Sequence, residues 1–522
     1  MLKRLWKQYA IWIDLGLLTT LAMGLRVWGI GFDLPNLYHP DEYVYVTIAL
    51  KILKTGSYNP HFFNYPTLFF YILAFLGYIP YFLAYASRGL VSNLDGLTLP
   101  VEVIPRDVTI TSMPSEFLAG RLLTAVFAVG TVVLVYWIGR KLFSRQVGFI
   151  AGLLLAVSPT HVRISHFITP DVMMTFFVTL AVLLAYQVMV SGRQRDYLLA
   201  GAAVGLAATT KYNAGAAIVL LLAAHLLHEG RQKLVDRNLV TGVLTCGVVF
   251  LIGSPYMLLD LPTFLNDLAF EMRHYALLTE LGQVGSSWFW YVQYMARTEG
   301  LVSLLAVIAI AYAFLKRTRK GLFVASFSVV YFLWVSSYTV RNDRTLAPIL
   351  PLISLLTATL IHNVLQALSQ RVPQLRDRWA SATLATVVIA AVTSVPFSAS
   401  ITLDRALTRP DVRTTAAAWA EQDLPPGSRI VAESYSPAAA TSVHHLEYVR
   451  YATEHPLDWY RQNADYLFLY SRGHYATLVR DPQGQATMLA QYQAIFDQFE
   501  LVRQFDGPSL GYNYWVRIYR VK

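Results

Sequence analysis

Long apolar runs separated by short polar segments occupy residues 1–399. Nine of these runs are long enough, or nearly long enough, to cross a bilayer as helices. They lie at residues 12–30, 118–137, 147–165, 172–190, 239–255, 301–315, 322–338, 346–365 and 380–398. A further run at residues 198–228 is interrupted by Thr209-Thr210-Lys211-Tyr212-Asn213. It is long for one span and short for two, so we interpret it as two short helices that meet near Lys211. The pattern predicts a polytopic α-helical membrane protein with about eleven spans and additional juxtamembrane helices.

Basic residues gather in short clusters between these runs, around Arg140, Arg193, Arg237, Lys316 and Arg371. The positive-inside rule places every cluster in the cytoplasm together with the basic N-terminus, so an even number of spans separates one cluster from the next. Three apolar runs precede Arg140, so one of them does not span. The run at 66–86 is rich in tyrosine and contains a proline, which suits the membrane interface. We therefore expect a juxtamembrane element there, within one external loop at residues 31–117.

The composition changes at residue 400, where the last apolar run ends on the external side. Helices are expected at 411–422 and 486–500 and strands at 429–433, 465–471 and 512–521. The sequence thus predicts two domains, a transmembrane module at 1–399 and a small soluble extracytoplasmic α/β domain at 400–522.

The amino-acid composition excludes an ordinary soluble protein, because 55% of the 522 residues are hydrophobic and only 14% are charged. The net charge of +10 comes from the clusters between apolar runs, so it is a topology signal and not a nucleic-acid binding surface. A single cysteine, Cys246, leaves no intrachain disulfide and no cysteine metal cluster. We expect an integral, multi-pass protein of the plasma membrane, in bacteria the inner membrane, with a cytoplasmic N-terminus and an uncleaved first span.

The stretch Tyr38-His39-Pro40-Asp41-Glu42 places two adjacent carboxylates at the edge of the membrane. Charge is costly there unless it is paired, hydrated or used, so the pair is a candidate catalytic site. Pro40 followed by acids is also a common helix start, and this structural interpretation stays open. Neighbouring helical residues point about 100° apart, so a single carboxylate base is a more natural mechanism than a hydrolase pair.

Other polar residues expected on the external side have both signs of charge. Arg121 and Asp171 each open a span and are candidates either for the site or for a buried bridge with one another. Arg341 and Arg344 run against the positive-inside preference, and guanidinium groups bind phosphate well. His39, His161 and His166 lack a tight metal-ligand spacing. We therefore expect no cofactor, with a divalent metal as a possibility.

Several of these motifs together resemble the GT-C membrane glycosyltransferases, in the branch of the protein O-mannosyltransferases and the bacterial lipid A aminoarabinose transferases (glycosyltransferase family 39-like). The resemblance covers roughly residues 1–230. It rests on the acidic pair, Asn64-Tyr65-Pro66-Thr67-Leu68, Gly120-Arg121-Leu122, Gly139-Arg140-Lys141, Ser158-Pro159-Thr160-His161, Thr169-Pro170-Asp171 and Lys211-Tyr212-Asn213.

The resemblance implies transfer of one sugar, with inversion, from a polyprenyl-phosphate carrier to an acceptor hydroxyl on the extracytoplasmic side. It implies that Asp41 is the base and that Glu42 assists it. Expected at the substrate or its phosphate are Arg121, Asp171, Lys211, Arg341, Arg344, Tyr65 and His39. The expected partners are the polyprenyl-phosphate sugar donor, a protein, lipid or glycan acceptor, and membrane lipid. The alternatives are a lipid-linked oligosaccharide transferase with a divalent metal held by Asp41 and Asp171, and a transporter of an anionic lipid or solute.

Overall fold

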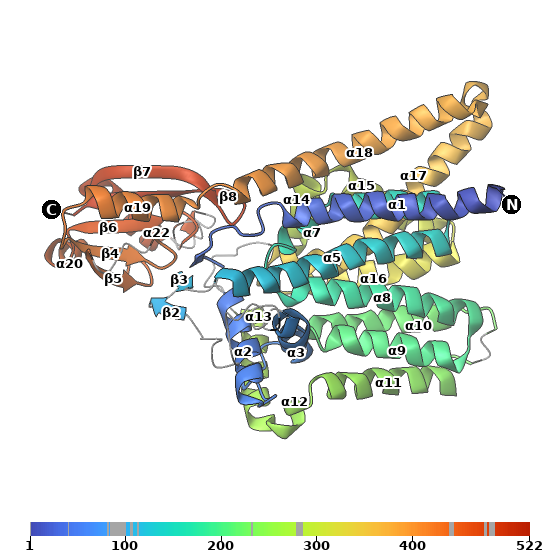
Figure 1. Cartoon of the computed structure of the whole chain (residues 1–522), viewed down its shortest axis with the longest axis horizontal. Coiled ribbons are helices and arrows are strands. Elements are labelled where there is room, and N and C mark those ends of the chain that lie inside the picture. The colour runs from blue at the N-terminus through green and yellow to red at the C-terminus, as the bar shows by residue number, and fades with distance from the viewer. Residues whose placement is uncertain are drawn as a thin grey trace.

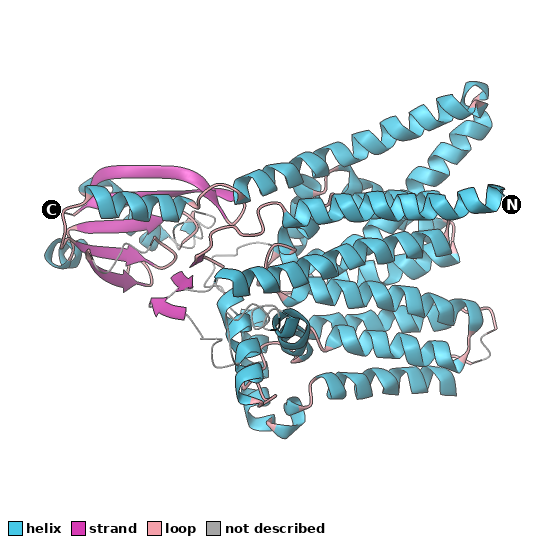
Figure 2. Ribbon diagram, in the orientation of Figure 1, coloured by secondary structure: helices cyan, strands magenta, loops and turns pink. Residues whose placement is uncertain are grey.

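A bundle of helices and a smaller mixed-sheet domain make up the computed structural model (Figures 1 and 2). It describes residues 2–39, 41–80, 83, 101–104, 108–111, 114–230, 233–277, 286–437, 443–473, 475, 478–479 and 486–521. Pro40 and most of the end of the expected 66–86 element lie outside these residues.

Each apolar run expected to span corresponds to a bundle helix. These helices are α1 (Leu2–Val27), α5 (Pro114–Leu142), α6 (Arg145–Ala156), α8 (Pro170–Ser191), α9 (Gln194–Ala208), α10 (Ile218–Leu226), α11 (Arg237–Gly253), α15 (Leu301–Leu315), α16 (Arg319–Val335), α17 (Leu350–Arg371) and α18 (Arg378–Leu407). In the described part of the chain, five helical segments are long and apolar enough to cross a membrane. The interrupted run forms two helices, with Lys211 just before the 3₁₀ turn η3 (Tyr212–Ala217).

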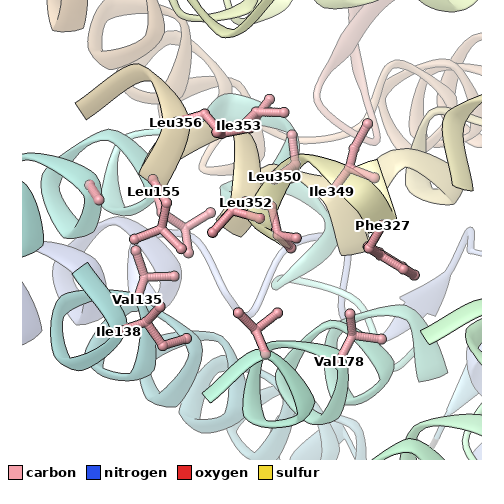
Figure 3. Close-up of a cluster of buried hydrophobic side chains, with 14 of the residues drawn as sticks. Val135, Ile138, Leu155, Val178, Phe327, Ile349, Leu350, Leu352, Ile353 and Leu356 are labelled. Atoms are coloured by element: carbon pink, nitrogen blue, oxygen red, sulfur yellow. The ribbon is translucent and has the colours of Figure 1, made fainter. Parts of the chain in front are cut away.

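The core of the bundle surrounds the first half of α17. Leu350, Leu352 and Leu355 of this helix are buried among side chains of α5, α6, α8 and α16 (Figure 3). Small residues permit close packing at other contacts: a Cβ on Gly201 of α9 would lie 2.0 Å from the carbonyl oxygen of Gly242 in α11. The helices that carry the site are therefore fixed by packing in the bundle and not by the loops alone.

Basic clusters gather at the end of the bundle that is remote from the sheet domain. Arg145, at the start of α6, makes a bidentate ion pair with Asp14 of α1 at 2.6 and 2.7 Å. Lys320, at the start of α16, donates to the carbonyl of Leu142, the last residue of α5. The N-terminus lies at this end and the sheet domain at the other (Figure 1). One end of the bundle is therefore basic, as the sequence pattern requires.

Short helices lie at the other end of the bundle. They include α2 (Glu42–Thr55), α3 (Leu68–Ile72), the π-helical turn η1 (Leu73–Tyr78), α7 (Pro159–Ile164), α12 (Tyr256–Leu259), α13 (Leu261–Leu277), α14 (Ser287–Thr298) and the 3₁₀ helix η4 (Asp343–Ile349). The remaining 3₁₀ helix η5 (Pro373–Arg376) joins α17 to α18. Helix α2 runs across the bundle axis in Figure 1. The external loop also pairs its strands β1 (Asn36–Leu37), β3 (Val108–Thr111) and β2 (Val101–Ile104) in that order, which the sequence did not predict.

The C-terminal domain is a five-stranded sheet with helices, in the strand order β5-β4-β6-β8-β7. The predicted elements correspond to α19 (Val412–Asp423), β4 (Arg429–Glu433), β6 (Tyr466–Tyr470), α22 (Ala486–Gln498) and β8 (Tyr512–Arg520). Unpredicted elements are β5 (His445–Val449), α20 (Leu457–Asn463) and β7 (Glu500–Ser509). Strands β4, β5 and β6 are parallel, whereas β8 pairs antiparallel with both β6 and β7.

Candidate active site

Asp41 lies directly before helix α2, so the expected helix start is confirmed. The backbone carbonyl of Asp41 accepts a hydrogen bond from the N–H of Tyr45 at 3.2 Å. The backbone N–H of Asp41 donates to Nδ1 of His39 at 3.3 Å. Its side chain makes no capping hydrogen bond. The carboxylate is therefore available for contacts outside its own helix, and it is 30% exposed.

A chain of alternating charges extends from Asp41 into the bundle. Arg344 Nη1 donates to Asp41 Oδ2 at 2.9 Å, and Arg344 Nε lies 3.9 Å from Asp171 Oδ2. The other oxygen of Asp171 accepts from Lys211 Nζ at 2.8 Å. Asp171 stands in the first turn of α8, where the helix dipole favours an anion. Residues far apart in sequence thus form one ordered cluster of two carboxylates and two cations.

A cavity of about 520 Å³ opens beside this cluster. Its lining includes Tyr65, Lys211, Asn213, Glu271 and Tyr275. Lys211 Nζ lies 5.8 Å from the ring centroid of Tyr65, within cation–π range. The cavity walls are largely apolar and aromatic with a few polar groups, as in sites for ligands that combine a hydrophobic part with a polar head.

Charge interactions set the protonation of the groups at this cluster. Burial opposes ionisation of Asp41, but Arg344, His39 and Lys211 outweigh it and hold the pKa of Asp41 below its ordinary value. Burial likewise opposes the charge of Lys211, yet Asp171 raises the pKa of the ammonium group above its usual value. Burial lowers the pKa of His39 to about 4 and raises that of Tyr65 to about 12. Near neutral pH the cluster therefore contains an ionised Asp41, a charged Lys211 and neutral His39 and Tyr65.

Glu42 and Arg121 form a separate, fully buried ion pair. Arg121 Nε and Nη2 donate to the two oxygens of Glu42 at 2.9 and 2.7 Å, and Arg121 Nη1 donates to the carbonyls of Ile30 and Phe32, each at 2.9 Å. The N–H of Ile168 donates to Glu42 at 2.9 Å. The alternative in which Arg121 forms a buried bridge with Asp171 is wrong, because Arg121 pairs with Glu42 and Asp171 pairs with Lys211. Glu42 and Asp41, although adjacent in the chain, therefore have different partners, as the rotation of about 100° per helical residue favours.

The other predicted residues lie at different distances from the cluster. The ring of His39 lies 4.7 Å from the ring of Phe167 at a tilt of 33°, and its Nδ1 accepts from the Asp41 N–H, so His39 shapes the start of α2. Tyr65 lines the cavity. Arg341 is half-buried in the segment before η4. Its predicted role at phosphate stays a prediction.

Helix α13 contributes site residues that sequence reasoning missed. Asp267 accepts from the N–H of Phe63 at 2.7 Å, and Glu271 accepts from Asn64 at 2.6 Å. Glu271 and Tyr275 also line the cavity. Asp267, Glu271 and Tyr275 recur every four residues, which puts them on one helical face. That spacing was the available signal, in the stretch between the apolar runs at 239–255 and 301–315.

The carboxylates present do not form a natural divalent-cation site. Among the described residues, no three His, Cys, Asp or Glu side chains come together as metal ligands. Asp41 and Asp171, the pair considered for a metal, flank the guanidinium of Arg344. Their charge is balanced by Arg344 and Lys211, cations of the protein itself.

The comparisons with known proteins agree with the predicted resemblance. A family model described as dolichyl-phosphate-mannose-protein mannosyltransferase matches residues 110–258, which include Arg121, Asp171 and Lys211. No curated protein matches the sequence.

Solved structures share the fold. ArnT from Cupriavidus metallidurans bound to undecaprenyl phosphate aligns with a TM-score of 0.52 and 15% identity, covering 97% of this chain and 98% of that chain. The archaeal oligosaccharyltransferase AglB from Archaeoglobus fulgidus, in complex with an inhibitory peptide and a dolichol-phosphate, aligns with a TM-score of 0.54 and 12% identity, covering 88% and 69%. An Archaeoglobus fulgidus oligosaccharyltransferase in complex with Zn and sulfate aligns with a TM-score of 0.54 and 14% identity, covering 96% of this chain and 72% of that chain. The resemblance to GT-C membrane glycosyltransferases of the mannosyltransferase and ArnT branch is confirmed.

Proposed function

We propose that this protein transfers a single sugar from a polyprenyl-phosphate carrier to an acceptor hydroxyl at the extracytoplasmic membrane face, with inversion at the anomeric carbon. The observation that carries the proposal is the charge chain itself: an ionised, partly exposed Asp41 lies one arginine away from Asp171 and Lys211, beside a cavity with mostly apolar walls. One carboxylate base and a cationic leaving-group site are what phosphate displacement by a hydroxyl requires.

In the proposed reaction, the acceptor oxygen attacks the anomeric carbon from the side opposite the phosphate. The new C–O bond forms while the bond from the anomeric carbon to the phosphate oxygen breaks, and the bonding electrons leave with the phosphate. Asp41 Oδ receives the acceptor proton. Lys211, at the cavity wall, and Arg344, between Asp41 and Asp171, supply the positive charge for the departing phosphate.

The buried pair of Glu42 and Arg121 is proposed to act on the shape of the site. Arg121 ties helix α2 to the carbonyls of Ile30 and Phe32, while Glu42 also holds the N–H of Ile168 near the start of α8. Asp41 and Asp171 begin or adjoin these same helices. The pair therefore sets the separation of the two aspartates, which is a positioning role.

The orientation in the membrane belongs to the same proposal. The basic end of the bundle faces the cytoplasm, and the end with α2, Asp41 and the sheet domain faces outward. The fold shared with ArnT and AglB, whose structures hold undecaprenyl phosphate and dolichol-phosphate, supports a polyprenyl-phosphate carrier as the donor. The acceptor is a protein, lipid or glycan hydroxyl.

The direct test is Asp41→Asn in a transfer assay with purified protein and a labelled polyprenyl-phosphate sugar. Loss of a general base lowers turnover by about 10²- to 10⁴-fold. Asp423→Asn, at the exposed end of α19, is the matched control and should transfer at the wild-type rate. Wild-type turnover by folded Asp41→Asn would refute the assigned base. Export of the labelled lipid without release of its sugar would instead favour the transporter.

A further inference from the structure

The sheet domain contacts the bundle through the tip of its β7–β8 hairpin. Two residues of the tip have left-handed backbone angles, with φ of 50° at Leu510 and 83° at Gly511. Gly511 lies so close to α18 that a Cβ there would come 2.2 Å from Leu403. A tight turn with positive φ and this close approach both favour glycine. The hairpin tip is therefore shaped for a specific contact.

Leu510 is inserted into an apolar cluster of the bundle. It is 4% exposed and packs in the cluster that contains Phe32, Tyr38 and Phe167. Tyr38 precedes Asp41 by three residues, and the ring of Phe167 contacts the ring of His39. The tip of a soluble domain thus reaches the segment that leads into the proposed base.

A buried arginine of the sheet domain holds the same segment. The guanidinium of Arg413, on α19, lies 3.7 Å from the ring centroid of Tyr38 and donates to Ser509 Oγ at 2.8 Å. Asp411 holds this guanidinium through two further bonds of 3.0 Å. The hydroxyls of Thr414 and Tyr38 share a hydrogen bond at 2.9 Å. Tyr38 is therefore fixed by the sheet domain at its ring and at its hydroxyl.

A second connection reaches the cation that pairs with Asp41. The hydroxyl of Tyr512, the first residue of β8, donates to Asp343 Oδ2 at 3.2 Å. Asp343 also pairs with Arg163 and accepts from Tyr294 at 3.3 Å. Its Oδ1 accepts from the backbone N–H of Arg344 at 2.8 Å, and the side chain of Arg344 holds Asp41. Asp343 thus fixes the backbone from which Arg344 reaches Asp41.

We propose that the β7–β8 hairpin tip, residues Ser509–Tyr512, together with Arg413 and Thr414, is a positioning element that holds Asp41 and Arg344 in register from outside the bundle. One connection runs through Tyr38 to Asp41, and the other runs through Asp343 to Arg344. Because each partner of the ion pair is reached by its own contact with the sheet domain, loss of one contact lets that partner move relative to the other. This inference rests on the proposed function for its catalytic consequence and not for its contacts.

Two isosteric substitutions in the sheet domain test the proposal. Thr414→Val removes the hydrogen bond to Tyr38, and Tyr512→Phe removes the one to Asp343, with little change of volume. Tyr514→Phe, two residues further along β8, is the matched control, and its ring packs on Tyr470 inside the sheet domain. All variants are made in the full-length protein in lipid nanodiscs.

Because small misplacements of reacting groups are costly, we expect kcat to fall about 5-fold in each single variant and about 20-fold in the double variant. The KM for the donor and the melting temperature should change little. Loosening Arg344 weakens the partner of the Asp41 carboxylate, so the acidic limb of the pH–rate profile should move to higher pH. A purely structural contact would lower the melting temperature and leave that limb in place.

Hydrogen–deuterium exchange supplies a readout that needs no activity. Exchange should rise at residues 342–346 in Tyr512→Phe and at residues 36–39 in Thr414→Val, and Tyr514→Phe should match the wild type. If the wild-type protein transfers no sugar, the proposed function fails and exchange alone decides the positioning contact. Wild-type exchange and an unshifted pH profile in the folded double variant would overturn the inference.

Discussion

Removing the two charges of the Glu42–Arg121 pair, singly and together, distinguishes a positioning role of Glu42 from a catalytic one. Glu42→Gln keeps the size of the side chain but leaves Arg121, 1% exposed, without its counterion. Removing one partner of a buried ion pair costs about 3–5 kcal/mol. Arg121 retains the carbonyls of Ile30 and Phe32 and the ring of Phe32 at 3.8 Å, so we expect the lower end, about 3 kcal/mol.

The reverse change should cost more. Arg121→Met leaves the Glu42 carboxylate, 0% exposed, without a counterion and with a hydrogen bond from the Ile168 N–H, so we expect a loss of about 4 kcal/mol. In the double variant neither charge is left alone. The double variant should lose about 4 kcal/mol of unfolding free energy. This loss is about 3 kcal/mol smaller than the sum of the losses in the two single variants.

Unfolding free energies in mixed detergent micelles measure this cycle, and transfer rates normalised to folded protein accompany it. If Glu42 only positions helix α2, the turnover of the folded double variant should stay within about 10-fold of the wild-type value. Removal of a general base would instead lower turnover by about 10²-fold or more. Additive free energies would contradict the mutual pairing of the two charges. A folded Glu42→Gln variant with turnover as low as that of Asp41→Asn would refute the positioning role.

Three further predictions follow from the charges in the structure. Because Arg344 holds the pKa of Asp41 below its ordinary value, the acidic limb of the transfer rate should lie below the ordinary aspartate pKa of about 3.9. Arg344→Gln should move this acidic limb upward in a pH–rate profile, and an unmoved limb would contradict the pairing. Burial raises the pKa of Glu433, in the sheet domain, to about 8, above its ordinary value of 4.5. The stability that this neutral carboxyl contributes is complete below about pH 4.5 and is lost as the pH rises to about 8, and Glu433→Gln should flatten that dependence in thermal unfolding. Since Asp41 and Asp171 flank a guanidinium, chelation should leave transfer unchanged, whereas loss of activity with recovery on adding Mn²⁺ would favour the metal-dependent alternative.

The hydrophobic pattern predicted much of the bundle because span length and basic clusters are local properties of the chain. The break at Lys211 and the helix start at Asp41 were visible for the same reason: each is caused by a few adjacent residues. The elements of the sheet domain with clear alternation were found, whereas β5, with alternating half-buried and exposed positions, and β7 were missed. Their pairing depends on strands distant in the sequence.

The amino-acid sequence alone therefore determined that Asp41 and Glu42 stand at an interruption of a membrane protein, and it supplied the cations of the site. Tertiary structure decided which cation serves which acid: Arg344 pairs with Asp41, Arg121 with Glu42 and Lys211 with Asp171. The physical reason is that charge pairing is set by distance and burial, and residues separated by more than 300 positions meet only through helix packing. Asp41 and Glu42 are adjacent in the chain, yet the first carboxylate is partly exposed and the second is fully buried.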